Sequence, residues 1–176
     1  MDFPEEQSKD VKVKSLEAIF LALREAQARY LVVGGLAVIA HGYVRLTKDL
    51  DLVLDLSPDE LPKALRALGS LGYHPMAPVP LIDFADPDLR HEWTEDKQMK
   101  VFNLVSDRHP DVSIDIFPKD PFSFAAEYAA AVWKQITPKV TAPMVSVSAL
   151  IRLKQVADRP QDRVDIDKLR KLHPDS

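Results

Sequence analysis

Asp49 and Asp51 belong to a short segment, 49–54, in which aspartate and then valine alternate with leucine. The alternation predicts a β-strand, and residues two apart on a strand leave the same face about 6.5 to 7 Å apart. Carboxylates at that spacing can share two hard cations about 3.5 to 4 Å apart, as two-metal phosphoryl chemistry requires. The alternative is a strand with one solvated acidic face, which Asp55 supports because it falls on the same parity.

A third aspartate, Asp115, stands between isoleucines in the segment 112–117. This segment predicts a strand buried on at least one face, where a carboxylate must be paired, hydrogen-bonded or bound to a metal. The alternative is an aspartate at a strand end that faces water. Asp115 gains its interest as a candidate site residue from its combination with Asp49 and Asp51.

Gly34 and Gly35 follow the apolar run 30–33, which predicts a buried strand, and precede a predicted short helix at 36–40. Paired glycines at such a junction allow close approach of a ligand to the backbone, and the first amides of a helix are free donors. This arrangement predicts a phosphate-binding turn. The alternative is that the two glycines only form a tight turn.

Composition limits the class of protein and of metal. With 176 residues, 46% of them hydrophobic, the chain fits a single compact domain. The absence of cysteine excludes thiolate ligands and disulfides, so a bound metal would be oxygen-liking Mg²⁺ or Mn²⁺. The net charge of −4 indicates no broad basic surface for nucleic acid. The chain contains neither a membrane-spanning run nor a signal-peptide pattern, so we expect a cytoplasmic protein without membrane contact.

Hydrophobic periodicity predicts the elements that position these residues. Helices are predicted at about 11–28, at 36–40, from Ser57 to about Gly72, from Asp120-Pro121 through Val132, at 148–157 and at 160–172. Strands are predicted at 30–33, 49–54, 100–105 and 112–117, with a short extended piece at 144–147. The stretch 75–96 is rich in proline and charge and predicts a long loop or irregular hairpin. These elements predict one α/β (α+β) domain over 1–176, with a core at about 11–147 and C-terminal helices at about 148–172.

The order of these features resembles the nucleotidyltransferase superfamily with the DNA polymerase beta-like core. A strand ending in two glycines, a short helix, an Arg-x-Thr, an Asp-x-Asp strand and a later lone aspartate make up the pattern. The C-terminal motif Lys154-x-x-Ala157-x-Arg159-Pro160-x-Asp162-x-x-Asp165 looks more closely like the branch related to nucleotidyltransferase toxins of abortive-infection systems. The resemblance spans about residues 30 to 170 and implies a mixed β-sheet flanked by helices.

The resemblance implies a role for each matching residue. Gly34 and Gly35 would hold a nucleoside triphosphate through main-chain amides, and Asp49, Asp51 and Asp115 would bind two Mg²⁺ or Mn²⁺ ions. Many active members have serine where this chain has Gly35, so one phosphate contact is missing or supplied elsewhere. Lys154 would reach the nucleotide phosphates as a mobile point charge, and the alternative is an ordinary solvated lysine.

Several neighbouring residues have a different expected role. Arg159, Asp162 and Asp165 are predicted to pin the two C-terminal helices together as charge pairs. Arg45 and Thr47 are predicted either to brace the Asp-x-Asp strand or to line the pocket. His41 fits a helix-end residue that interacts with carbonyls. His91 has no partner at ligand spacing, so both histidines stay outside the predicted site.

The resulting functional prediction is metal-dependent transfer of a nucleoside monophosphate from a triphosphate to an acceptor, with release of pyrophosphate. The acceptor is open: a small molecule, a protein side chain or the end of a transfer RNA. A second copy of the chain or another partner would complete the pocket. Two alternatives remain: a non-catalytic nucleotide- or partner-binding module, which Gly35 favours, and a toxin acting with a cognate antitoxin.

Overall fold

The computed structural model describes residues 4–176, with side chains from residue 12 onward. A seven-stranded sheet forms the centre, in the order β3-β4-β5-β2-β1-β7-β6. The strands are β1 (Tyr30–Val33), β2 (Asp49–Leu54), β3 (His74–Pro75), β4 (Phe102–Val105), β5 (Ser113–Ile116), β6 (Val132–Thr137) and β7 (Val140–Met144). The β2–β5 and β1–β7 pairs are parallel and the other four pairs are antiparallel, so the sheet is mixed.

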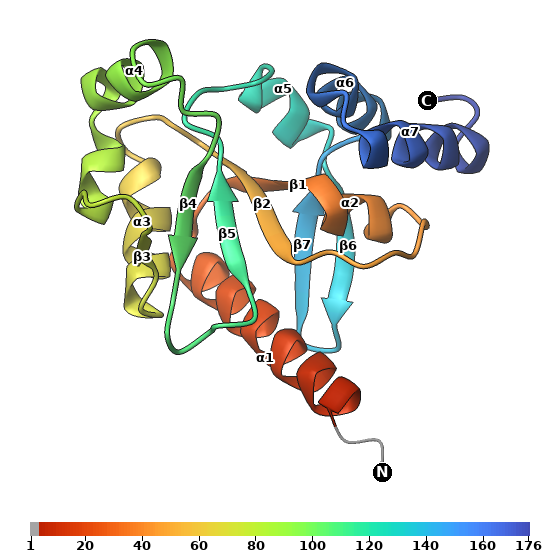
Figure 1. Ribbon diagram of the computed structural model, residues 1–176, viewed down its shortest axis with the longest axis horizontal. Helices are drawn as coiled ribbons and strands as arrows, with labels where there is room; N and C mark the ends of the chain where they lie inside the picture. Colours follow the sequence, from red (N-terminus) through yellow and green to blue (C-terminus); the bar gives the residue numbers. More distant parts are fainter. Residues whose placement is uncertain (1–3) are drawn as a thin grey trace.

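Helices surround this sheet. They are α1 (Pro4–Glu25), α2 (Gly34–Ala40), α3 (Leu61–Ser70), α4 (Pro87–Glu95), α5 (Phe124–Ala129), α6 (Val147–Ala157) and α7 (Pro160–Leu172), with a 3₁₀ helix, η1, at Leu81–Ala85. Helix α1 contacts α3 and the β6–β7 hairpin, whereas α2 contacts β1, β2 and α6. Figure 1 shows α6 and α7 lying next to each other beyond the end of the sheet, near α5. The predicted α/β domain with a mixed sheet and flanking helices is confirmed.

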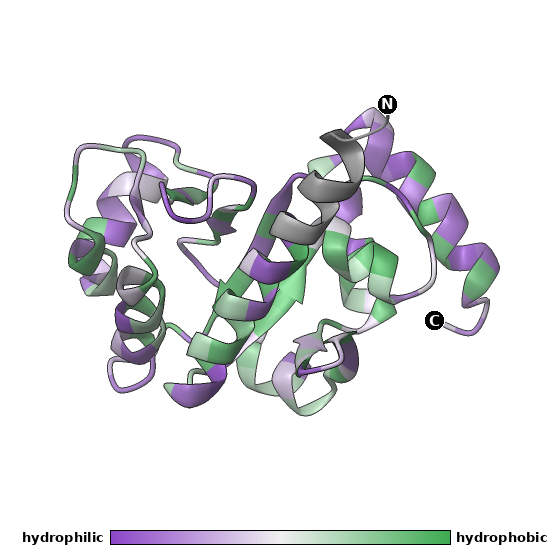
Figure 2. Ribbon diagram, turned by 90° about the horizontal axis from the view of Figure 1, so that it is seen from below, coloured by the Kyte–Doolittle hydropathy of each residue, from purple (hydrophilic) through white to green (hydrophobic). Residues whose placement is uncertain are grey.

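The core lies between the sheet and its helices. All four residues of β1 are buried, and Ile19, Phe20 and Leu23 present one buried stripe of α1. Figure 2 shows the hydrophobic colouring concentrated on the central strands, with hydrophilic residues on the outer surfaces of the helices. Within residues 4–176, none of the helices has the length and apolar character that a bilayer crossing requires.

The helix predicted from Ser57 begins later, at Leu61. Residues 57–60 form a separate turn, in which the Ser57 amide donates to the Asp55 carboxylate. The Ser57 carbonyl in turn accepts hydrogen bonds from the amides of Glu60 and Leu61. Ser57 is therefore not the N-cap of α3, because backbone and Asx-type bonds use the groups that a cap at Ser57 would need.

Two further elements correct the sequence-based prediction. The stretch 75–96 is not simply a loop: it contains η1 and α4, whose N-cap Asp86 accepts hydrogen bonds from two backbone amides. The helix predicted through Val132 ends at Ala129, and Val132 instead begins β6, which pairs with β7. Pairing across a tight hairpin decides the conformation of this β-branched and aromatic segment over its helix-like spacing.

Candidate functional site

A cavity of about 660 Å³ opens between the sheet and the C-terminal helices. Its walls come from the end of β1 and start of α2, from the loop before β2, from β2 and β5, and from the α6–α7 junction. The six residues predicted for the site all line it: Gly34, Gly35, Asp49, Asp51, Asp115 and Lys154. The fold therefore gathers residues that lie as much as 120 positions apart in the chain, such as Gly34 and Lys154, around one space.

The sheet register brings the carboxylates together. Strands β2 and β5 are parallel neighbours, and Asp51 is the direct partner of Asp115. Asp49 lies opposite Ser113, whose hydroxyl donates a 2.5 Å hydrogen bond to the Asp49 carboxylate. The Asn103 side chain on β4 donates to the Asp115 carboxylate. Two adjacent strands thus present three aspartates at the wall of one cavity.

The negative charges of these aspartates repel one another. Burial raises the pKa of Asp51 to about 7, and the charges of Asp115 and Asp49 add to this effect, while Lys154 and Arg159 oppose it. Burial also raises the pKa of Asp115, although the hydrogen bond from Asn103 counteracts it. The cluster consequently favours either a proton or a bound cation.

The carboxylates do not yet form a closed metal site. Among residues 4–176, no three or more histidine, aspartate or glutamate side chains converge closely enough to hold an ion. The donor set nevertheless fits a hard divalent cation, because it consists only of carboxylates and because burial, together with the charges of Asp115 and Asp49, raises the pKa of Asp51. Asp49, Asp51 and Asp115 are the residues that would hold it.

The two glycines pack closely against neighbouring side chains in the directions that a Cβ would take. Gly34 has a φ of +64°, and a Cβ on it would lie 2.0 Å from Asp51 Oδ2. Gly35 is buried, and its Cβ would lie 2.5 Å from Thr47 Oγ1 and 2.8 Å from Thr47 Cβ. The space that a side chain on residue 35 would need is therefore filled by Thr47. Both glycines are needed for the close contact of the β1–α2 turn with the segment that carries Asp49 and Asp51.

We expect Gly34→Ala to destabilise the protein by about 1 to 3 kcal/mol, because a left-handed backbone and a carboxylate both exclude the methyl group. Urea unfolding measures the change. Gly69→Ala is the matched control. Gly69 lies inside helix α3, and a Cβ there would meet Leu81 at an ordinary contact distance of 3.4 Å. A loss of stability no larger for Gly34→Ala than for Gly69→Ala would contradict the assignment of Gly34 to this close packing.

Lys154 lies in a buried ion-pair network on the C-terminal helices. Its ammonium is 3.0 Å from Asp162 Oδ1 and 2.7 Å from Asp165 Oδ2, and the three side chains are 5% exposed or less. Burial alone would raise the pKa of Asp162, but hydrogen bonds from Arg159 and Lys154 outweigh it and hold that pKa at about 2. The predicted charge pairing of the two C-terminal helices is confirmed, and Lys154 takes part in it. Contact between Lys154 and a phosphate stays a prediction.

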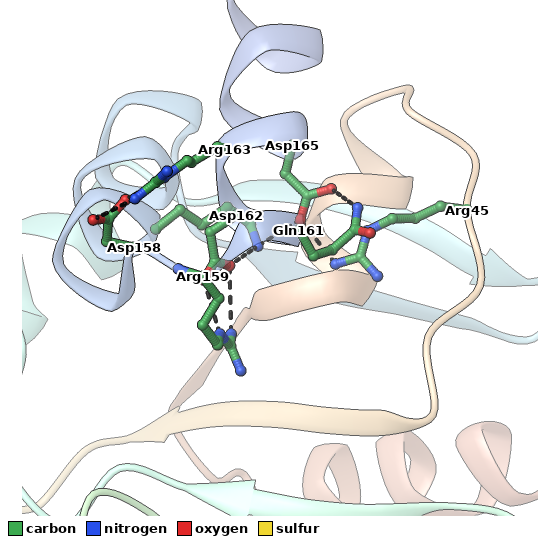
Figure 3. Close-up of polar contacts among 8 residues, drawn as sticks. Arg45, Asp158, Arg159, Gln161, Asp162, Arg163 and Asp165 are labelled. Atoms are coloured by element: carbon green, nitrogen blue, oxygen red, sulfur yellow. Dashed lines mark hydrogen bonds and ion pairs between the residues drawn. The ribbon is translucent and has the colours of Figure 1, made fainter.

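Arg45 connects this network to the loop before β2. Its guanidinium donates to Asp165 Oδ2 at 2.9 Å and to the Leu46 carbonyl at 2.8 Å. Figure 3 shows Arg45 and Gln161 converging on Asp165, while Arg159 meets Asp162 separately. Thr47 donates to the Asp49 carbonyl. Arg45 and Thr47 therefore do both things predicted as alternatives, because they brace the segment and also line the cavity.

The two histidines lie where the sequence predicted. His41 follows helix α2, and its Nε2 is 2.8 Å from the Val145 carbonyl. Burial lowers the pKa of His41. His91 is exposed on α4 and, like His41, does not line the cavity. Lys48 and Gln161 also line the cavity, and no recognisable sequence motif marks either residue.

Comparison with known proteins identifies the fold. A scan against models of protein families finds no match, and a search of curated proteins finds no relative. Among solved structures, the lincomycin-bound lincosamide antibiotic adenylyltransferase LnuA matches with a TM-score of 0.54 and 15% identity, over 90% of this chain and 96% of that one. ANT(2'')-Ia in complex with adenylyl-2''-tobramycin matches with a TM-score of 0.55 and 18% identity, over 89% and 86%. JHP933 from Helicobacter pylori matches with a TM-score of 0.54 and 15% identity, over 96% and 68%. The chain thus has a nucleotidyltransferase-like fold, as its sequence predicts.

Proposed function

We propose that this protein is a nucleotidyltransferase that moves a nucleoside monophosphate from a nucleoside triphosphate to an acceptor. One observation carries the proposal: Asp51 and Asp115 are partners on adjacent parallel strands, with Asp49 beside them, at the wall of a cavity of about 660 Å³. The raised pKa of Asp51 supports it, because a folded protein that keeps three neighbouring carboxylates forgoes stability unless a cation is bound.

Each part of the cavity wall has a proposed role. Asp49, Asp51 and Asp115 would bind Mg²⁺ or Mn²⁺, which when bound would neutralise phosphate charge and lower the pKa of an acceptor hydroxyl. The main-chain amides at Gly34 and Gly35 would meet the triphosphate. Lys154 would add positive charge at the opposite wall, where its presence already lowers the pKa of Asp51.

The proposed reaction is an in-line displacement at the α-phosphorus. A bond forms between the acceptor oxygen and the α-phosphorus, the bond from the α-phosphorus to the bridging oxygen breaks, and pyrophosphate leaves. The acceptor hydroxyl releases its proton in the same overall reaction. The contribution of the cavity is to hold both reactants in one geometry, which converts a bimolecular encounter into a local step.

The alternative of a non-catalytic module rests on the missing hydroxyl at Gly35. Thr47 Oγ1 lies 2.5 Å from the position that a Cβ on residue 35 would take. A threonine hydroxyl therefore occupies the space that a serine side chain at position 35 would need. This observation favours the catalytic proposal, since Thr47, a residue that carries a hydroxyl, also lines the cavity.

The acceptor remains a separate proposal. The similar structures carry lincomycin and adenylyl-2''-tobramycin, so a small hydroxyl-bearing molecule is one candidate class. A protein side chain and a transfer RNA end are the others, and the last two would suit a toxin with a cognate antitoxin. Incubation with labelled triphosphates and cell extract separates the classes, because label would appear in the small-molecule, protein or RNA fraction.

We expect a nucleoside triphosphate with Mg²⁺ to raise the melting temperature, because ligand binding to the folded state alone stabilises it. At about 100 times the dissociation constant the gain is about 2.7 kcal/mol. Thermal denaturation with four ribonucleoside triphosphates, in Mg²⁺ and in excess chelator, tests this expectation. Equal stabilisation with chelator would contradict the metal-dependent site, and no stabilisation by any triphosphate would contradict the proposed function.

A further inference from the structure

Two basic residues at the α6–α7 junction line the cavity, and they differ in how much of their charge is available. Lys154 is buried, and its ammonium already contacts two carboxylates. The Arg159 side chain is 74% exposed and pairs with Asp162 alone. Lys154 would have to break a buried ion pair to reach a ligand, whereas Arg159 would not.

The guanidinium of Arg159 is held in place but keeps free hydrogen-bond donors. Its Nε donates to Asp162 Oδ2 at 2.8 Å, and its Nη2 donates to Asp162 Oδ1 at 3.4 Å. Asp162 also accepts a hydrogen bond of 3.1 Å from the backbone amide of Arg159, which is the N-cap residue of α7. A guanidinium has five N–H donors, so most of them stay free for a further acceptor.

Asp162, which anchors Arg159, is itself held firmly in place. Asp162 is 1% exposed and is fixed from its other side by the Lys154 ammonium at 3.0 Å. Figure 3 shows Arg159 extending out of the helix pair below Asp162, while Arg163 and Asp158 form a separate pair on the other side of α7. Arg159 is thus a preorganised cation, and ordering it for a ligand costs little additional entropy.

The charge pattern of the cavity indicates what Arg159 faces. Asp49, Asp51 and Asp115 occupy the sheet wall, and Arg159 belongs to the opposite, helical wall of the same cavity. Its charge is felt at Asp51, where it lowers the pKa. A ligand that fits between a carboxylate wall with its cations and a fixed guanidinium is a polyanion, and a forked guanidinium matches phosphate oxygens.

We propose that Arg159 is a direct phosphate-binding residue, which contacts the polyphosphate of the nucleotide through the donors that Asp162 leaves free. The inference rests on the proposed function and deepens it by assigning the phosphate contact to Arg159. Lys154, through Asp162, then holds Arg159 in position. The sequence motif suggested Lys154 for the phosphate contact, whereas the geometry leaves Arg159 available for it.

The test compares two arginines of the same helix end. Arg159→Met removes the proposed contact and keeps an aliphatic stem, and Arg163→Met makes the same change in net charge at the exposed Arg163–Asp158 pair. Arg159→Lys keeps the charge without the fork. Affinity is measured by titration calorimetry with magnesium tripolyphosphate and with the four common ribonucleoside triphosphates, and melting curves check that each variant is folded.

We expect Arg159→Met to weaken binding of these probes by about 10-fold to 100-fold, as for the loss of a hydrogen bond to a charged group. Arg163→Met should leave binding within about twofold, and Arg159→Lys should fall between. Equal weakening by both methionine variants would reduce the effect to net charge and overturn the inference.

The proposed function and this inference fail in different ways. Unchanged binding by Arg159→Met, with binding lost in Asp51→Asn, would overturn the role of Arg159 and leave the nucleotidyltransferase proposal in place. Absence of binding of every probe to the wild-type chain in Mg²⁺ would overturn both. If Arg159→Met melts early, Arg159→Lys decides, because full affinity in a folded lysine variant contradicts recognition by the fork.

Discussion

Asp51→Asn is expected to stabilise the metal-free protein at neutral and alkaline pH and to abolish nucleotidyl transfer. Burial, and then the charges of Asp115 and Asp49, raise the pKa of Asp51 to about 7 in the folded protein. In the unfolded chain the pKa of an aspartate is about 4. The folded-state pKa is higher than the unfolded-state pKa. The contribution of Asp51 to the free energy of unfolding is therefore fully present below the unfolded-state pKa, and it is lost as pH rises through the folded-state pKa. The window therefore runs from about pH 4 to about pH 7.

The size of the effect follows from that window. At about 1.4 kcal/mol per pKa unit, removing the charge of Asp51 should raise the free energy of unfolding by about 2 to 4 kcal/mol above neutral pH. Asparagine has nearly the same shape, so it adds no new clash with Gly34. Urea unfolding in chelator at about pH 4 and about pH 8 measures the difference between wild type and variant, which should be small at the lower pH.

The same change should remove activity. Loss of one cation ligand is expected to lower the rate of transfer at least about 100-fold, by analogy with the loss of one charge-stabilising group. Asp59→Asn serves as the control, because Asp59 is an exposed carboxylate away from the cavity. A variant Asp51→Asn that is less stable than wild type at about pH 8 and still active would show that Asp51 has a structural role.

Lys154→Met is expected to lower the free energy of unfolding by about 3 to 5 kcal/mol. The substitution removes the cation from two carboxylates, Asp162 and Asp165, which are 1% and 0% exposed. Breaking a buried ion pair from one side costs about this amount, and the two buried carboxylates then keep only Arg159 and Arg45 as cationic partners. For a chain of this size the melting temperature should fall by roughly 10 °C.

Two further variants test the cause. Lys171→Met removes a lysine from an exposed pair with Asp167 on the same helix and should leave stability unchanged. Adding Asp162→Asn to Lys154→Met should recover part of the loss, because asparagine can still accept the Arg159 amide but carries no charge. Stability of Lys154→Met within about 1 kcal/mol of wild type would mean that the network contributes little to the fold.

Local sequence patterns determined several elements of this protein. The bounds of β1, β2 and α7 agree with the prediction, and α6 differs from it by one residue at its start. Each of these segments has one dominant period, either two or 3.6 residues, and is bounded by a turn or capping residue. The same-face placement of Asp49 and Asp51 is part of this local information, since it depends only on the strand period.

Other features depended on the tertiary structure, because they involve contacts between distant segments. Asp115 becomes the partner of Asp51 only because β5 pairs with β2. Five elements separate these two strands in the chain: α3, β3, η1, α4 and β4. No local pattern specifies which strands become neighbours. The hairpin strand β6 was missed for the same reason, since its pairing with β7 overrides the spacing that suggested a helix.

Packing likewise decided which basic residue is buried and how much space lies beside the glycines. The sequence indicated that Lys154, Arg159, Asp162 and Asp165 belong together, but not which cation would be buried. Helix α7 folds back on α6, so Asp165 contacts Lys154 from eleven residues away and Arg45 from the loop before β2. The space beside Gly35 is filled by Thr47, twelve residues along the chain. Burial and free volume are properties of the whole packed chain, and residue type alone does not determine them.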